Sequence, residues 1–200
     1  RKRFAKYRWT LRLMPIVEQP VESVALVFAV LCHDASQLSR TSMQLEDLFG
    51  NIQSRSEVFP FDFSTYYSEE MGDGLIKQLL RIAAPVDPAV LYDVKRRTMQ
   101  LERELAESTR GALRRRANVD PGLVSVESLV LATTKYSGHR ICIGPGLFAE
   151  TTLLFQKGKC QPMQWTYPDY KTPVVQNFLL NVREGLLQRR RVTEKGSSTV

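Results

Sequence analysis

The sequence predicts an α+β fold. Apolar runs of strand length alternate with segments whose apolar residues recur at helical spacing, and this periodicity distinguishes strands from helices. A chain of 200 residues, 43% hydrophobic and 24% charged, suffices for one globular domain with a full-sized core. The longest apolar run is far shorter than the roughly 18 residues needed to cross a bilayer, so we expect a soluble protein with no membrane partner.

The first predicted unit is a strand, a helix and a second strand. Residues 22–32 are apolar almost throughout and rich in valine, as in an inner strand of a sheet. Asp34 stands at the N-cap position of the next segment and Gly50 at its end, which predicts a helix between them. Alternating apolar residues over 54–63 predict the second strand, and the glycines of 71–74 predict a chain reversal behind a long loop.

The second predicted unit is a strand, a helix and a strand. An apolar run at 75–83 precedes Asp87 and Pro88, which are an N-cap and a first helical residue. Residues 89–107 have apolar side chains on one helical face and charged side chains on the opposite face. Residues 123–133 are again apolar and predict a fourth strand.

The order strand, helix, strand, strand, helix, strand is that of the ferredoxin-like split βαβ core, βαββαβ. Three shorter strands, at about 139–143, 147–155 and 160–165, extend it as a C-terminal antiparallel meander. Residues 173–187 have helical spacing and predict a closing helix. We therefore expect an α+β protein with this core, the meander and the helix.

The net charge of +7 lies mainly at the chain ends. Residues 1–15 carry six basic side chains and no acid, and residues 183–200 carry five basic side chains and two acids. We expect a basic, disordered N-terminal extension at 1–20, one globular domain at 21–187 and a basic tail at 188–200. Nucleic acid is expected as a partner only through these tails.

The three cysteines are far apart, and no C-x-x-C spacing occurs. An odd count without such a spacing argues against a disulfide framework and against a zinc site. The chain also has no basic segment followed by an apolar stretch of secretory-signal type. These observations favour the reducing cytoplasm.

Split βαβ connectivity predicts which polar segments meet. The end of the first strand, the loop of the second hairpin and the entry to the fourth strand share one edge of the sheet. We expect residues 33–34, 62–70 and 118–122 to converge there, together with 165–170. Residues 133–135 are expected at the opposite edge, because they follow the fourth strand.

The converging segments supply side chains suited to a phosphorylated or nucleotide-like small molecule. Tyrosine and tryptophan rings stack on a base or sugar, and lysine or arginine neutralises a phosphate. The candidate ligand-binding residues are Asp62, Tyr66, Tyr67, Glu70, Asn118, Asp120, Lys135, Arg140, Trp165, Tyr167 and Asp169. The alternative is an aromatic cluster that clamps the loops, with the basic groups paired to Glu150 or to these carboxylates.

A divalent metal is the candidate cofactor. Carboxylates at the corresponding edge of ferredoxin-like palm domains hold Mg²⁺ for phosphoryl transfer, and this is an analogy of fold alone. The candidate metal ligands are Asp34, Asp62, Glu70 and Asp120. Alternatively, Asp34 caps a helix and Asp120 organises an Asp-Pro-Gly turn. No P-loop motif and no nucleophile-elbow serine is present.

Several sequence blocks in one order resemble a bacterial and archaeal family of domain-of-unknown-function proteins. The blocks are FPFDFSTYY at 59–67, EEMG at 69–72, NVDPG at 118–122, LATTK at 131–135, HR at 139–140 and WTYPDY at 165–170. The resemblance covers about residues 21–182. Because that family is uncharacterised, the resemblance assigns neither a reaction nor a ligand.

Three functions stay open at this point. The first is binding of a phosphorylated or nucleotide-like small molecule at a loop edge rich in tyrosine and carboxylates. The alternative is a structural or partner-binding domain without enzymatic activity, and the second alternative is a metal-dependent phosphoryl-transfer or hydrolytic enzyme. Ligand binding predicts a concave site with converging acidic, basic and tyrosine side chains, whereas the structural alternative predicts acids directed into solvent.

Overall fold

The computed structural model describes residues 21–109 and 112–197, and the predicted extension at 1–20 lies outside the described residues. Its main feature is a nine-stranded antiparallel sheet. Across the sheet lie β11 (Lys159–Pro162), β10 (Leu147–Gln156), β8 (Ser128–Thr133), β7 (Ala117–Val124), β1 (Val24–Cys32), β4 (Ile76–Val86) and β2 (Ile52–Arg55). β3 (Phe59–Pro60) pairs with β4, and β9 (Ile141–Gly144) pairs with β10. The α+β class and the antiparallel sheet are thereby confirmed.

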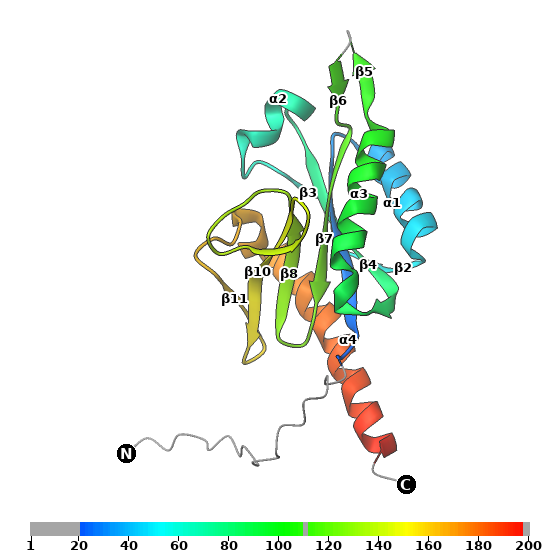
Figure 1. Ribbon diagram of the computed structural model, residues 1–200, viewed down its shortest axis with the longest axis vertical. Helices are drawn as coiled ribbons and strands as arrows, with labels where there is room; N and C mark the ends of the chain where they lie inside the picture. The colour runs from blue at the N-terminus through cyan, green and yellow to red at the C-terminus, as the bar shows by residue number, and fades with distance from the viewer. Residues whose placement is uncertain (1–20, 110–111, 198–200) are drawn as a thin grey trace.

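The main helices cover both faces of this sheet (Figure 1). They are α1 (Ala35–Phe49), α3 (Leu91–Leu105) and α4 (Pro173–Ser197). Shorter elements are α2 (Ser68–Met71), the 3₁₀ turns η1 (Thr65–Tyr67), η2 (Pro88–Val90) and η3 (Pro168–Lys171), and the hairpin of β5 (Glu107–Thr109) and β6 (Ala112–Arg114). Within the described ranges, none of the helices combines the length and the apolarity needed to cross a membrane.

The helix ends follow the predicted capping residues. Asp34 Oδ1 accepts a hydrogen bond from the backbone N–H of Gln37 at 2.8 Å, and α1 ends before Gly50, whose φ is 95°. Asp87 accepts from the backbone N–H of Ala89 at 2.8 Å, and Pro88 follows it as the first residue of η2. These local signals thus set where two helical segments begin.

Two apolar clusters form the core, one on each face of the sheet. All nine residues of β1 are buried, as an inner strand requires. Leu26 and Phe28 belong to the cluster that contains apolar side chains of α1 and α3, whereas Val27 belongs to the cluster that contains Leu179 of α4. The closing helix is therefore confirmed, and it continues to Ser197, beyond the predicted end at residue 187.

The predicted fourth strand at 123–133 is wrong as a single element. The chain turns after Val124, where Ser125 N donates to Ser128 O at 2.9 Å, and β8 returns antiparallel to β7. The turn contains neither glycine nor proline, and the Ser125 hydroxyl instead accepts from the backbone N–H groups of Glu127 and Ser128, each at 3.0 Å. Residues 133–135 consequently lie beside the start of β7, at the edge opposite to the predicted one.

The predicted strand at 54–63 is also divided. β2 ends at Arg55, and the backbone N–H of Ser56 then donates to Leu79 O of β4 at 2.8 Å. Pairing with β4 resumes at Phe59 and ends at Pro60. The segment leaves the sheet after this point and forms the loop, η1 and α2, which overhang one end of the sheet (Figure 1).

Candidate functional site

The two halves of the sheet part where β7 meets β8. These strands pair only from Gly122 to Val124, although β7 remains paired with β1 as far as Ala117 and β8 with β10 as far as Thr133. Pro121 stays in register with β1, although proline has no backbone N–H to donate. The missing donor is therefore on the side of β7 that faces β8. A Cβ on Gly122 would approach Leu131 Cδ2 to 2.7 Å, so any larger residue in this pair would displace the Leu131 side chain.

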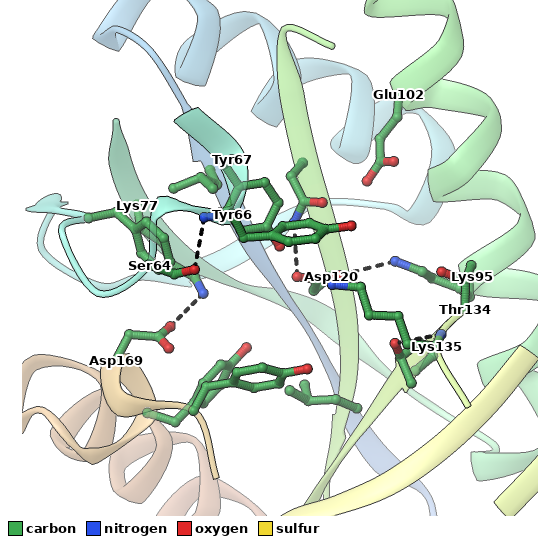
Figure 2. A pocket seen from close by; sticks show the side chains of 18 of the residues that line it. Ser64, Tyr66, Tyr67, Lys77, Lys95, Glu102, Asp120, Thr134, Lys135 and Asp169 are labelled. Carbon is green, nitrogen blue, oxygen red and sulfur yellow. Dashed lines mark hydrogen bonds and ion pairs between the residues drawn. The ribbon is translucent and has the colours of Figure 1, made fainter. Parts of the chain in front are cut away.

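A cavity of about 470 Å³ lies at this parting. Its walls come from β1, β4, β7, β8, β10, α3, η3 and the loops at 61–67 and 134–135 (Figure 2). Its lining residues include four basic side chains and four acidic side chains: Lys77, Lys95, Arg115, Lys135, Glu102, Asp120, Glu150 and Asp169. Because the numbers are equal, the pairing among these groups decides which charges are available to a ligand.

Lys77 and Asp169 form the most deeply buried ion pair of the site. Lys77 Nζ donates to Asp169 Oδ2 at 2.6 Å, and both side chains are buried. The ammonium group also lies 5.2 Å from the ring centroid of Phe61 and 4.9 Å from that of Tyr170. Two aromatic faces and one carboxylate thus compensate for the water that Lys77 loses.

Lys95 reaches Asp120 from α3 (Figure 2). Its Nζ donates to Asp120 Oδ1 at 3.1 Å and to Val119 O at 3.2 Å, and Asn118 Nδ2 donates to Asp120 Oδ2 at 2.9 Å. Burial opposes ionisation of Asp120, but Lys95, Lys77 and these hydrogen bonds outweigh it, and the pKa of Asp120 is lowered.

Two predictions are wrong here. Helical spacing placed Lys95 on the charged face of its helix, yet it is buried against β7, where its pairing with Asp120 agrees with the alternative that basic groups pair with the site carboxylates. Asp120 was expected in an Asp-Pro-Gly turn under the structural alternative, yet Asp120, Pro121 and Gly122 all lie within β7. The side chain of Lys95 can reach inward because β7 and β8 part at this point.

Arg115 organises a second group of charges beside the cavity. Its Nε and Nη2 donate to the two oxygens of Glu70 at 3.0 and 2.7 Å, and its Nη1 donates to Asn118 Oδ1 at 2.6 Å. Glu102 accepts from the backbone N–H of Val119 at 2.6 Å. Burial raises the pKa of Glu102, although Lys95 and Arg115 oppose the shift.

The cavity mouth is formed by tyrosines and by Lys135. The Lys135 ammonium lies 3.5 Å from the ring centroid of Tyr66, whose side chain is 58% exposed. Tyr67 stands nearly perpendicular to Tyr66, at a centroid distance of 5.1 Å. Burial, followed by the charge of Asp120, raises the pKa of Tyr67. Burial likewise raises the pKa of Tyr167, so both hydroxyls are neutral donors at neutral pH.

The structure brings seven of the predicted residues to the cavity lining and leaves four outside it. The lining contains Tyr66, Tyr67, Asn118, Asp120, Lys135, Tyr167 and Asp169. Outside it, Asp62 is exposed and Glu70 reaches the site only through Arg115. Arg140 donates to Glu150 Oε2 at 2.6 Å and to the Tyr167 hydroxyl at 2.9 Å.

Trp165, the fourth residue outside the lining, packs behind the cavity. It stacks on His139 at a centroid distance of 4.4 Å and donates from Nε1 to Thr151 O at 2.9 Å. His139 in turn contacts Glu150 Oε2 through Nε2 at 3.0 Å. Trp165, His139 and Arg140 therefore fix the position of the buried Glu150 carboxylate, which lines the cavity.

The four candidate metal ligands are not brought together. Asp34 caps α1, Glu70 pairs with Arg115, and Asp120 pairs with Lys95. Over residues 21–109 and 112–197, no group of three or more His, Cys, Asp or Glu side chains has a metal-binding arrangement. The three cysteines, all within those ranges, are free thiols.

Lys77, Glu102 and Arg115 line the site but were not among the predicted residues. Lys77 carried a detectable signal, because it is a charged residue inside an otherwise apolar strand. Glu102 had no comparable signal, since helical spacing placed it on the charged face of α3. Arg115 lay in a basic stretch and could not be distinguished from its neighbours.

The comparison with protein families gives one match. The model of the family described as "Domain of unknown function (DUF4416)" matches residues 22–185, which agrees with the predicted resemblance. Comparisons with curated proteins and with solved structures find no match to the chain.

Proposed function

Since this chain belongs to the DUF4416 family, whose description states no function, we propose a function from the cavity itself: binding of a phosphorylated or nucleotide-like small molecule. The observation that carries this proposal is the state of Lys135. Its ammonium lies over the Tyr66 ring at the cavity mouth and has no acid partner among the described residues. A phosphate placed beside Lys135 therefore gains a charge-assisted contact without breaking an existing ion pair.

The other cations of the cavity are already paired. Lys77 is bound to Asp169, Lys95 to Asp120, and Arg115 to Glu70. They hold the cavity walls in place, whereas Lys135 is available to a ligand. The neutral hydroxyls of Tyr67 and Tyr167 supply further donors toward an anionic group.

The size of the cavity and the aromatic residues at its mouth suit the remainder of such a ligand. A volume of about 470 Å³ lies within the range of roughly 300–1,000 Å³ typical of small-molecule sites. The exposed Tyr66 provides a face on which a base or sugar ring can stack. The ligand would then span from this ring to the lysine beside it.

The cavity acids also bear on the structural alternative. That alternative predicts carboxylates directed into solvent, but Glu150 and Asp169 are buried at the cavity wall. The pairing of Arg140 with Glu150, in contrast, agrees with that alternative. Partner binding is favoured by a different observation, the exposure of Tyr136 at 77% and of Ile141 at 73%. We keep it as the second candidate function.

We also propose a ferredoxin-like core for this fold. The support is the antiparallel order β7-β1-β4-β2, with α1 between β1 and β2 and α3 between β4 and β7. The reducing cytoplasm is the proposed location, since all three cysteines are free thiols.

The test is thermal unfolding with a panel of nucleoside monophosphates and sugar phosphates. Specific binding to the native state raises the melting temperature by mass action. We expect at least one compound to raise it for the wild type and for Lys159→Gln, a control at the β10–β11 hairpin, and none to raise it for Lys135→Gln. If no compound raises it, or if Lys135→Gln responds as the wild type does, the proposal is wrong.

A further inference from the structure

Tyr170 of η3 has a hydroxyl group without a partner in the wall of the cavity. The residue is 3% exposed, and no hydrogen bond to its hydroxyl occurs among residues 21–109 and 112–197. The oxygen is not fully enclosed by protein atoms, and the cavity is the space that it can reach. Burial, followed by the charge of Asp169, raises the pKa of Tyr170, so the hydroxyl keeps its proton and can donate. Because buried hydroxyls are normally hydrogen-bonded, this free donor points to a ligand.

Asp169 provides a free acceptor in the same wall. Its Oδ2 accepts from Lys77 Nζ at 2.6 Å, whereas none of the described residues donates to its Oδ1. The Asp169 side chain is buried and lines the cavity. Tyr170 lies against the same Lys77 ammonium, at 4.9 Å from its ring centroid. The free donor and the free acceptor therefore belong to one part of the cavity wall.

The buried part of the cavity is electrically balanced. Lys77 is paired with Asp169, and Lys95 is paired with Asp120. A phosphate bound at either lysine would have to displace an acid from it, and that displacement costs free energy. Lys135 at the mouth needs no such displacement, since it has no acid partner among the described residues. The cavity thus suits a ligand with one phosphate at the mouth and an uncharged part inside.

Hydroxyl groups match this inner part better than a nucleobase does. The Lys77 ammonium lies over the rings of Phe61 and Tyr170, so the ring faces on that side are already covered. A hydroxyl group both donates and accepts, so a single ligand hydroxyl can accept from the Tyr170 phenol and donate to Asp169 Oδ1. A base would leave at least one of these two groups unpaired unless it presented both an acceptor and a donor there.

We propose that the ligand of the cavity is a sugar phosphate, with its phosphate at Lys135 and its hydroxyl groups at Tyr170 and Asp169. This inference rests on the proposed function and makes it more specific, because it selects a sugar phosphate over a nucleotide. The two ends of the ligand meet different parts of the protein. The phosphate binds at the exposed mouth, and the sugar fills the buried part of the cavity of about 470 Å³.

The experiment is titration calorimetry of the full chain with matched phosphate compounds. The probes are ribose and glucose with a phosphate on the terminal carbon, adenosine monophosphate, and phenyl phosphate, which has a ring and a phosphate but no sugar hydroxyl. We expect a sugar phosphate to bind about tenfold more tightly than phenyl phosphate, as two ordinary hydrogen bonds provide. Adenosine monophosphate should bind no more tightly than ribose phosphate. Equal affinity for phenyl phosphate, or tighter binding of adenosine monophosphate than of both sugar phosphates, overturns the inference.

Tyr170→Phe tests the assigned hydroxyl group. The change removes only a group without a protein partner, so the ligand-free variant should unfold at a temperature no lower than that of the wild type. We expect it to weaken sugar phosphate binding by about two- to tenfold. Tyr92→Phe is the matched control, because this tyrosine of α3 lies outside the cavity lining, and it should bind as the wild type does. Equal affinities of the two variants would overturn the assignment.

Lys135→Gln separates this inference from the proposed function. If no phosphate compound binds, or if Lys135→Gln binds these compounds as the wild type does, the proposed function is wrong and the inference fails with it. If binding requires Lys135 but is equal for phenyl phosphate and the sugar phosphates, the proposed function holds and only the inference is wrong.

Discussion

Lys77 and Arg81 lie four residues apart on the same face of β4, and both are buried, but their surroundings differ. Lys77 has Asp169 at 2.6 Å and two aromatic rings around its ammonium group. Arg81 has no such partner among the described residues and lies against Gly185 of α4. The comparison shows that this fold neutralises one buried charge with its own acid and packs the other against the backbone of α4 at Gly185.

The cavity as a whole follows the pattern of Lys77. Its buried cations are paired with acids, so its walls are stable before a ligand arrives. Lys135 lies at the exposed mouth and, like Arg81, has no acid partner among the described residues. The paired cations of the cavity therefore serve the fold, and Lys135 is its candidate for recognition.

The largest expected effect comes from breaking the Lys77–Asp169 pair. Asp169→Asn keeps the shape of the side chain but leaves the Lys77 ammonium buried beside a neutral group. Breaking a buried pair in this way costs about 3–5 kcal/mol of unfolding free energy. Urea unfolding measures this loss, with Glu184→Gln, from an exposed pair with Arg191, as the control. Equal and small losses in both variants would mean that the pair does not stabilise the fold.

For Arg81 we expect a substitution to raise the free energy of unfolding, whereas a substitution of Lys77 should lower it. Lys77→Met should destabilise the protein, because it leaves the Asp169 carboxylate buried and unpaired. Arg81→Met removes a buried charge that has no acid partner among the described residues, and we expect a gain of about 1 kcal/mol. The same urea titration in chloride buffer compares the two variants, and a loss for Arg81→Met would show that Arg81 is already neutralised within the chain.

A smaller effect on stability, which changes with pH, should distinguish Asp120 from Glu102. The folded-state pKa of Asp120 is lowered, so its stabilisation is present above the unfolded pKa of about 3.9 and is lost as pH falls through the folded value. Asp120→Asn should therefore lower stability at neutral pH and flatten the decline in acid. Urea midpoints between pH 7 and pH 2 test this expectation, and an unchanged acid decline would contradict it.

The stability contributed by Glu102 should depend on pH in the opposite direction. Its folded-state pKa is raised, so its contribution is most favourable below about 4.3 and is lost as pH rises through the folded value. Glu102→Gln keeps an oxygen that can accept from Val119 N–H and should be more stable than the wild type at neutral pH. The same pH series measures it, and a loss of stability at pH 7 would show that the ionised form is needed.

Lys135→Gln should have the smallest effect on stability. The side chain is exposed, and surface substitutions of this kind usually change stability by less than about 0.5 kcal/mol. The change should abolish ligand-dependent stabilisation at the same time, so stability and binding separate at this residue. A large loss in urea unfolding of the ligand-free protein would instead make Lys135 part of the fold.

The sequence alone determined the local elements of this protein. These elements depend on residues that are close together in the chain. They are the helix caps at Asp34 and Asp87, the closing glycine at Gly50 and the apolar run of β1, and the structure has them as predicted. Convergence of the loop at 62–70 with the start of β7 also follows from the order of the elements. Local backbone chemistry and connectivity are sufficient for such predictions.

Tertiary structure decided the pairing of charges and the shape of the site. Lys77 and Asp169 are 92 positions apart, and neither residue type nor spacing indicates that they meet. The turn at Ser125 contains no glycine or proline and is held by the serine hydroxyl, which is a weaker sequence signal, so its effect on the position of Lys135 was not predictable from periodicity. Lys95 reads as a surface residue in the helical pattern, and it is buried because β7 and β8 part beside it. Periodicity reports which face a side chain occupies, whereas its partner depends on contacts between distant segments.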